Sequence, residues 1–260
     1  MKMNELKLVY FSPTGTTRKV IIEAARSIDL KSTSHDFSVY KEKKPVLKFA
    51  ENDFALFGIP VYYGRVPALF TEYLKGITGN GTPAALIATY GCRDYEDALL
   101  ELKDIVEMNG FKVIAAAAFP AEHSLAPTIG ARRPNKADLK TIAEYGVELN
   151  RRIKKSDTFD SFDISLPGNT PYRKYGKNML FPKADVNSCT ECKACAKVCP
   201  AGAISLKDPK KTDKDKCIGC LKCVRICRQN ARSVNSLKMK MVTSRLSKVC
   251  QSDKKADIFL

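Results

Sequence analysis

The chain has 260 residues, with 44 lysines and arginines against 28 acidic residues and a formal net charge of +16 at pH 7. This length suits one medium domain plus a small one, and no apolar run reaches the roughly 18 residues of a membrane-spanning helix. The first residues show no export signal, so we expect a cytoplasmic protein. Its ten cysteines then favour metal ligation over disulfides.

The positive charge is concentrated toward the carboxyl end. Residues 1–150 hold 19 basic and 18 acidic residues, whereas residues 183–260 hold 18 basic and seven acidic ones. Metal sites built from cysteine thiolates would neutralise part of this excess, because several thiolates around a metal leave a net negative charge. The remainder would attract an acidic partner, a nucleic acid or a lipid surface.

The first predicted strand covers residues 5–11, and apolar residues recur at helical spacing from Arg18 onward. A turn rich in hydroxyl groups lies between the two, where helix amides and the helix dipole attract anions. The alternative is an ordinary turn in which Ser or Thr caps the helix. The candidate phosphate-binding residues are Ser12, Thr14, Gly15, Thr16 and Thr17.

Four more apolar segments predict strands near residues 35–40, 53–61, 83–89 and 111–119, and helical patterns separate the last three. Strands that alternate with helices indicate an α/β fold with a parallel sheet covered on both faces. Ligands of such sheets bind at the carboxyl ends of the strands. The hydroxyl-rich turn and the loops after residues 59 and 88 all lie at such ends.

The hydroxyl-rich turn resembles the phosphate loop of flavodoxins in both composition and position. The resemblance implies a doubly wound, five-stranded parallel sheet that binds FMN, with the ring held by the two later loops. Since the chain has no Trp, tyrosines would stack on the ring, although each Tyr could instead simply pack in the core. The candidate ring-binding residues are Pro60, Val61, Tyr62, Tyr63, Gly64, Thr89, Tyr90, Gly91, Cys92 and Tyr95.

A long loop and a change of composition follow the fifth strand. Residues 120–134 form a loop long enough to cover a site, and it contains His123. This histidine is either a proton donor to reduced flavin or a packed or surface residue. Residues 135–155 predict the closing helix, and residues 156–182 are polar and turn-rich.

The second half contains two identically spaced cysteine runs, each of the form Cys-x2-Cys-x2-Cys-x3-Cys. Disulfides would need an oxidising compartment, and zinc would leave cysteines of each run unused. The runs resemble bacterial ferredoxins that hold two 4Fe-4S clusters, in which the fourth cysteine of each run serves the other cluster. The resemblance implies one cluster on Cys189, Cys192, Cys195 and Cys227, and a second on Cys217, Cys220, Cys223 and Cys199. Arg228 stands where that family usually has proline.

The whole chain resembles a bacterial and archaeal family in which a flavodoxin-like domain precedes a small α+β two-cluster ferredoxin domain. We expect a flavodoxin-like domain at residues 1–155, a connecting segment at 156–182, a ferredoxin-like domain at 183–235 and a basic tail at 236–260. The family implies electron transfer between FMN, the two clusters and a redox protein, which the basic charge suggests is acidic, in an anaerobe.

Two other functions stay open from the sequence. One is an FMN-dependent reductase of a small molecule, which would make the chain an oxidoreductase and not a carrier. The other, less favoured, is a nucleic-acid-binding protein with structural clusters. Cys92 and Cys250 lie outside the cysteine runs, and neither receives a metal role.

Overall fold

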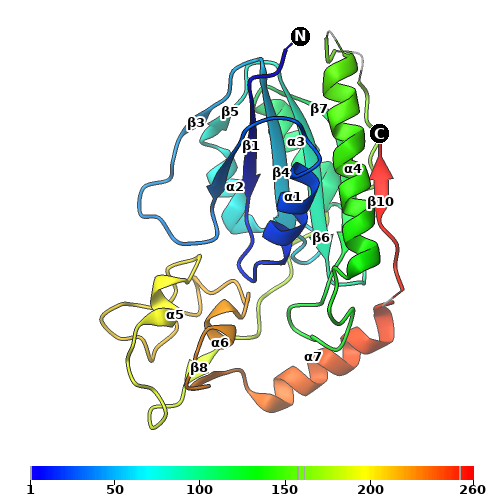
Figure 1. The fold of residues 1–260 in the computed structure, drawn as a ribbon. Coiled ribbons are helices and arrows are strands. Elements are labelled where there is room, and N and C mark those ends of the chain that lie inside the picture. The colour runs from blue at the N-terminus through cyan, green and yellow to red at the C-terminus, as the bar shows by residue number, and fades with distance from the viewer. Residues whose placement is uncertain (1, 157, 161, 252) are drawn as a thin grey trace.

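The computed structural model of the chain describes residues 2–156, 158–160, 162–251 and 253–260 (Figure 1). Among these residues, no helix has both the length and the apolar character needed to cross a membrane. The helices and strands are β1 (Glu5–Tyr10), α1 (Thr16–Ala25), β2 (Ser32–Asp36), β3 (Leu47–Lys48), β4 (Asp53–Pro60), α2 (Ala68–Leu74), β5 (Ile77–Thr78), β6 (Thr82–Tyr90), α3 (Ala98–Met108), β7 (Phe111–Pro120), α4 (Lys136–Lys155), β8 (Lys183–Ala184), α5 (Ala194–Lys197), α6 (Lys222–Arg225), β9 (Arg232–Ser233), α7 (Ser236–Val249) and β10 (Asp257–Phe259).

The main sheet has the strand order β10-β7-β6-β4-β1-β2. All neighbouring strands in it are parallel except β10, which runs antiparallel to β7. If the five parallel strands are numbered consecutively, their order is 2-1-3-4-5, which is the flavodoxin-like order. The predicted fold class is therefore confirmed, and the ligand-binding switch point of this topology lies between β1 and β4.

Two features of the sheet differ from the prediction. The second strand is Ser32–Asp36, earlier than the expected 35–40, and its residues are mostly exposed. An exposed edge strand carries no apolar pattern, and the buried residue Phe37 of the expected range lies beyond the strand end. The expected five strands become six because β10, which lies within the predicted basic tail, joins the sheet.

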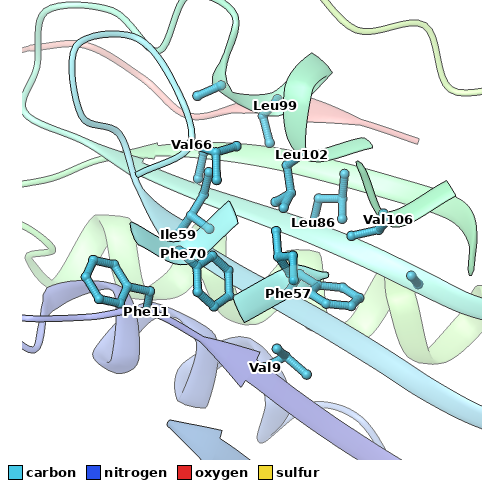
Figure 2. Packing of buried hydrophobic residues seen from close by; sticks show 14 of the residues in the cluster. Val9, Phe11, Phe57, Ile59, Val66, Phe70, Leu86, Leu99, Leu102 and Val106 are labelled. Atoms are coloured by element: carbon cyan, nitrogen blue, oxygen red, sulfur yellow. The ribbon is translucent and has the colours of Figure 1, made fainter. Parts of the chain in front are cut away.

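Side chains alternate between the two faces of the sheet, as the pleat of a β-strand requires. On one face, Val9, Phe57 and Leu86 pack against α2 and α3 (Figure 2). On the other, residues such as Leu8 and Leu56 pack against α1 and α4. Both faces of the sheet are thus apolar, which explains why its central strands read as continuous apolar runs.

The segment after α4 is held against the flavodoxin-like part by backbone hydrogen bonds to one carboxylate. Asp97, which is buried, accepts from the peptide N–H of Asn169 at 2.9 Å and from that of Arg173 at 2.7 Å. These bonds lower the pKa of Asp97 against the opposing effect of burial. The predicted connecting segment is therefore anchored along α3.

A buried ion pair continues this anchorage. The Arg65 guanidinium donates two hydrogen bonds to Glu101, both of 2.7 Å, and Glu101 is 3% exposed. The rings of Tyr172 and Tyr175 lie 4.8 and 4.4 Å from the guanidinium carbon. The cation thus contacts both helix α3 and the connecting segment. The connecting segment in turn leads to the cysteine-rich part, so the ion pair holds it against the sheet domain.

We predict that Glu101→Ala lowers the free energy of unfolding by about 3 kcal/mol, because it leaves the Arg65 cation buried without its partner. Urea unfolding followed by circular dichroism measures the change. Glu107→Ala is the control: Glu107 pairs with Lys103 at 3.4 Å on the outer surface of α3, and its loss should cost at most about 0.5 kcal/mol. Equal effects of the two variants would contradict the structural role of Glu101.

Candidate functional site

The hydroxyl-rich loop connects the end of β1 to the start of α1. Gly15 adopts φ 90°, a left-handed conformation that favours glycine. Ser12 Oγ accepts from the peptide N–H of Arg18 at 2.9 Å. Thr17 Oγ1 lies 2.6 Å from Thr89 Oγ1. Two of the predicted hydroxyl groups therefore hold the loop to the helix and to β6.

The rest of the loop presents donors to an open space. Within the described residues, the peptide N–H groups of Thr14, Thr16 and Thr17 have no acceptor. A Cβ atom placed on Gly15 would meet no atom within 4 Å. Unpaired amides at a helix N-terminus are suited to bind a phosphate. The loop fits the phosphate group of FMN, which remains a prediction.

The second loop contains a tight two-residue turn. Tyr62 and Arg65 exchange backbone hydrogen bonds of 3.1 Å in both directions. Between them, Tyr63 and Gly64 have φ of 56° and 75°, which is the type I′ geometry. Burial, reinforced by the Cys220 sulfur, raises the pKa of Tyr62. The turn therefore lies between the sheet edge and the cysteine-rich part.

In the third loop, Tyr90 and Tyr95 are core residues. Their rings pack at 5.4 Å, and their exposures are 3% and 8%. The Tyr90 hydroxyl donates to the carbonyl of Lys255, just before β10. Both side chains pack in the core, and their contact with the flavin ring stays an untested prediction. The backbone of residues 89–92 still lies at the strand end, and Val61 donates to the carbonyl of Thr89 at 2.9 Å.

His123 packs directly on the third loop. A Cβ atom on Gly91 would lie 2.3 Å from its imidazole ring. His123 Nδ1 accepts from the peptide N–H of Leu125 at 3.2 Å, which places the ring proton on Nε2. Burial, assisted by the Arg93 cation, lowers the pKa of His123 to about 4. At neutral pH the residue is a neutral, packed imidazole with one N–H group to donate.

The two cysteines outside the runs come together. Cys92 is fully buried, with Ala126 and Ile129 around it, and Cys250 packs against the same cluster. The peptide N–H of Gln251 donates to the carbonyl of Cys92 at 2.9 Å. Burial raises the pKa of both thiols. Cys92 therefore connects the third loop to the end of α7.

The eight cysteines of the two runs line two cavities, four to each. The outer cavity, of about 430 Å³, is lined by Cys189, Cys192, Cys195 and Cys227. The inner cavity is smaller and is lined by Cys199, Cys217, Cys220 and Cys223. These are the two sets of four that the ferredoxin resemblance implies, and ligation itself remains a prediction. Among the described residues, no group of three or more His, Cys, Asp or Glu side chains is arranged to hold a single metal ion.

A repeat of 28 residues explains why the fourth cysteines cross over. The peptide N–H of Asp185 donates to the carbonyl of Ala231, and that of Asp213 to the carbonyl of Ala203, both at 2.8 Å. Each half therefore begins beside the end of the other half. Since the fourth cysteine lies four residues before that end, it is carried into the opposite cavity.

Burial changes the chemistry of the inner thiols. It raises the pKa of Cys220 to about 12 and that of Cys223 to about 11, against an ordinary value of 9.0. Metal binding must displace these protons, and the metal charge would supply the compensation. The inner cavity is thus suited to a cationic iron core that keeps the thiolates ionised.

Arg232 is a residue of this site that sequence reasoning missed. Its side chain lines the outer cavity and is 3% exposed. Its Nε–H is buried and has no hydrogen-bond partner among the described residues. Its charge also reaches the inner cavity, where it partly offsets the rise that burial causes in the pKa of Cys223 and of Cys217. An orphan donor on a buried cation between the two cavities fits an anionic group beside it. The only signal in the sequence is its position, 28 residues after Ile204.

The inner cavity faces the sheet edge. Cys199 accepts at its carbonyl from the peptide N–H of Tyr40 at 3.3 Å. Lys222 donates to the carbonyl of Ser38, also at 3.3 Å. The outer cavity includes Cys192, the one run cysteine that is exposed among those described. Figure 1 shows α5 and α6 beyond the carboxyl ends of the parallel strands.

Comparison with known proteins finds similarities to both parts of the chain. The family of 4Fe-4S dicluster domains matches residues 188–232, and no curated protein sequence matches the chain. A flavodoxin from the domain Archaea is similar over 58% of this chain and 99% of its own, with 16% identity and a TM-score of 0.41. The Fusobacterium nucleatum flavodoxin bound to flavin mononucleotide is similar over 58% and 99%, with 19% identity and a TM-score of 0.42. The rubredoxin oxygen:oxidoreductase of Desulfovibrio gigas is similar over 59% of this chain and 37% of its own, with 14% identity and a TM-score of 0.43.

We predict that Thr16→Ala weakens FMN binding about 10- to 100-fold, because a hydrogen bond to a charged group contributes about 1.5–3 kcal/mol. Calorimetric titration of the flavin-free protein with FMN measures the change. Thr71→Ala is the control, since the Thr71 hydroxyl donates to Ala68 within its own helix and should leave the affinity unaltered. An unchanged affinity in Thr16→Ala would show that its hydroxyl does not contact the phosphate.

We also predict that the His123 imidazole titrates near pH 4, because the folded state lowers its pKa from 6.5 to about 4. The neutral form is the one that the fold favours. The stability that it contributes is therefore fully present above about pH 6.5 and decreases as the pH falls toward 4. Proton NMR measures the midpoint, and the resonance missing from His123→Gln gives the assignment. A midpoint above 6 would contradict the packed position of the ring.

Proposed function

We propose that this chain, which combines a flavodoxin-like sheet with a 4Fe-4S dicluster domain, is an electron-transfer protein that holds one FMN and two 4Fe-4S clusters. When bound, the clusters would carry one electron each and the flavin would carry two. The eight run cysteines would hold the clusters, in the two sets that line the cavities, and the three sheet-edge loops would hold the flavin. The thiolate ligands favour a reducing, cytoplasmic setting.

One observation carries the proposal: the inner cavity lies against the same sheet edge as the predicted flavin loops. The Cys220 sulfur contributes to the raised pKa of Tyr62, and the Cys199 carbonyl accepts a hydrogen bond from the peptide N–H of Tyr40. On the other side, Asn178 donates to the carbonyl of Cys217 at 2.8 Å. These contacts hold the inner cavity between the outer cavity and the predicted flavin loops. The arrangement supports an electron path from the outer cluster through the inner one to the flavin.

The mouth of the outer cavity is the proposed contact for a redox partner. Lys193 and Arg228 line this cavity and are exposed. The acidic residue of the same rim, Glu191, is paired with Lys210 at 2.6 Å. The rim is therefore positive, and we propose an acidic one-electron carrier as the partner, because opposite charges accelerate association.

A flavin-dependent reductase is the second candidate, and the position of His123 is the observation that favours it. Its ring packs on Gly91 in a predicted flavin loop and carries a proton on Nε2. Such a group could orient a small substrate or donate a hydrogen bond to it. In this case the dicluster domain would deliver electrons to the flavin.

The test is anaerobic purification with quantification of iron, sulfide and flavin. About eight iron atoms and one FMN per chain are expected from two clusters and one flavin site.

The double variant Lys193→Glu/Arg228→Glu should slow electron exchange with acidic ferredoxins or flavodoxins at least about tenfold at low salt, and added salt should reduce the difference.

Lys31→Glu is the matched control, since Lys31 is exposed and lies before β2, at the opposite end of the sheet. Equal slowing in this variant would contradict docking at the outer cavity. Eight iron atoms without flavin would overturn the relay. Rapid, saturable oxidation by a defined small molecule, lost in His123→Gln, would establish the reductase instead.

A further inference from the structure

The two cysteines outside the runs are neighbours in space although they are 158 positions apart in the chain. Cys92 lies just after β6, and Cys250 directly follows α7. Cys92 is fully buried in a small apolar cluster, and Cys250 packs against the same cluster but is only half-buried. The fold therefore pairs the two thiols that the cysteine runs leave over, and one of the two is in contact with solvent.

A backbone hydrogen bond sets the distance between these cysteines. The peptide N–H of Gln251 donates to the carbonyl of Cys92 at 2.9 Å. With standard backbone dimensions, such a bond places the α-carbons of Cys92 and Cys250 roughly 4–6 Å apart. A disulfide spans α-carbons that are about 4.4–6.8 Å apart. The backbone therefore already holds the two cysteines at a separation that a disulfide can bridge.

Each sulfur has an arginine in its surroundings. Burial raises the pKa of Cys92, and the Arg133 cation opposes this rise through its charge and a hydrogen bond. Burial also raises the pKa of Cys250, the Cys92 sulfur adds to the rise, and Arg93 opposes it. A neighbouring cation stabilises a thiolate, which is the species that attacks a disulfide. The pair is thus protonated at neutral pH but has local support for the reactive form.

We propose that Cys92 and Cys250 form a reversible disulfide, which makes them a two-electron redox site separate from the eight run cysteines. In a reducing compartment, disulfides are usually transient and serve catalysis or redox sensing. A disulfide carries no charge, so the burial that disfavours the two thiolates does not disfavour the oxidised pair. The inference needs neither the flavin nor the clusters, and it therefore stands independently of the proposed function.

The oxidant in this step is a low-molecular-weight disulfide. Cys250 is the attacking thiol because it is the accessible one. Its thiolate attacks one sulfur of the small disulfide, a mixed disulfide forms, and the first small thiol leaves with a proton. The Cys92 thiolate then attacks the Cys250 sulfur and releases the second small thiol. The protein thiols lose two electrons and two protons, and the small disulfide gains them to become two thiols.

The disulfide would fasten the returning chain to the third loop. After Cys250, the carbonyl of Lys254 accepts from Arg133 at 2.7 Å and that of Lys255 accepts from the Tyr90 hydroxyl at 3.4 Å, before β10 pairs with β7. Hydrogen bonds in such a short terminal segment open locally. A covalent bond at the start of the segment would keep it in place through these openings, so oxidation would fix the chain that covers the third loop.

The test is anaerobic equilibration of the full chain with mixtures of glutathione and glutathione disulfide, followed by acid quenching, alkylation and peptide mass spectrometry. A peptide that joins Cys92 to Cys250 should appear. Its fraction should follow the ratio of glutathione disulfide to the square of glutathione, and dithiothreitol should remove it. Absence of this peptide at every ratio, or pairing of Cys250 with another cysteine of the chain, overturns the proposal.

Cys92→Ser is the matched variant, because it removes the second thiol and keeps a side chain of similar size. Cys250 should then retain glutathione as a mixed disulfide, which should not accumulate in the wild type. Cys250→Ser should leave Cys92 unmodified, since that thiol is buried. Accumulation of the adduct in the wild type would show that Cys92 does not attack it. If Cys92→Ser does not fold, the wild-type titration and Cys250→Ser decide the question.

Trypsin cleavage measures the fastening of the segment. Lys255 is exposed, and cleavage after it should be at least about threefold slower in the oxidised wild type than in the reduced protein, because proteolysis follows the open population. Equal rates in the two forms would overturn the role of the disulfide in holding the segment.

Discussion

The structure depends on a constraint of parallel sheets: every strand must be followed by a crossover, so all the strands end at the same edge. This edge gathers loops that are far apart in the sequence, including the hydroxyl-rich loop, the Tyr63–Gly64 turn and the loop that contains Gly91. The cysteine-rich part contacts the same edge through Tyr40 and Ser38. A single topological rule therefore brings the candidate sites for a flavin and for an iron-sulfur cluster next to each other.

Much of this arrangement could be predicted from the sequence. The central strands are buried on both faces, so they appear as uninterrupted apolar runs such as residues 54–59. The cysteine spacing is equally direct, since the number of residues between ligands determines what they can enclose. Both signals are local, and local signals survive without knowledge of the tertiary structure.

The features that were missed or misplaced have no local apolar signal. β2, whose range was misplaced, is an exposed edge with no apolar alternation, and β10 is three residues long and pairs with a strand about 140 positions earlier in the chain. The packing of Tyr90 and Tyr95 at a strand end likewise depends on the chain near Lys255, which is distant in the sequence. Arg232 could be recognised only once the 28-residue repeat showed which residue it replaces.

The return of the chain to the sheet at β10 changes how the cysteine-rich part should be viewed. It is an insertion between α4, a helix that packs on the sheet, and β10, a strand of the same sheet, and not a module that trails on a single linker. An inserted domain is attached at both ends, so a swinging motion, of the kind that many modular redox proteins use to shuttle electrons, would require β10 to detach. Under the proposed function, electron exchange between the two parts would therefore be insensitive to solvent viscosity, and mobility would be left to a partner that arrives from solution.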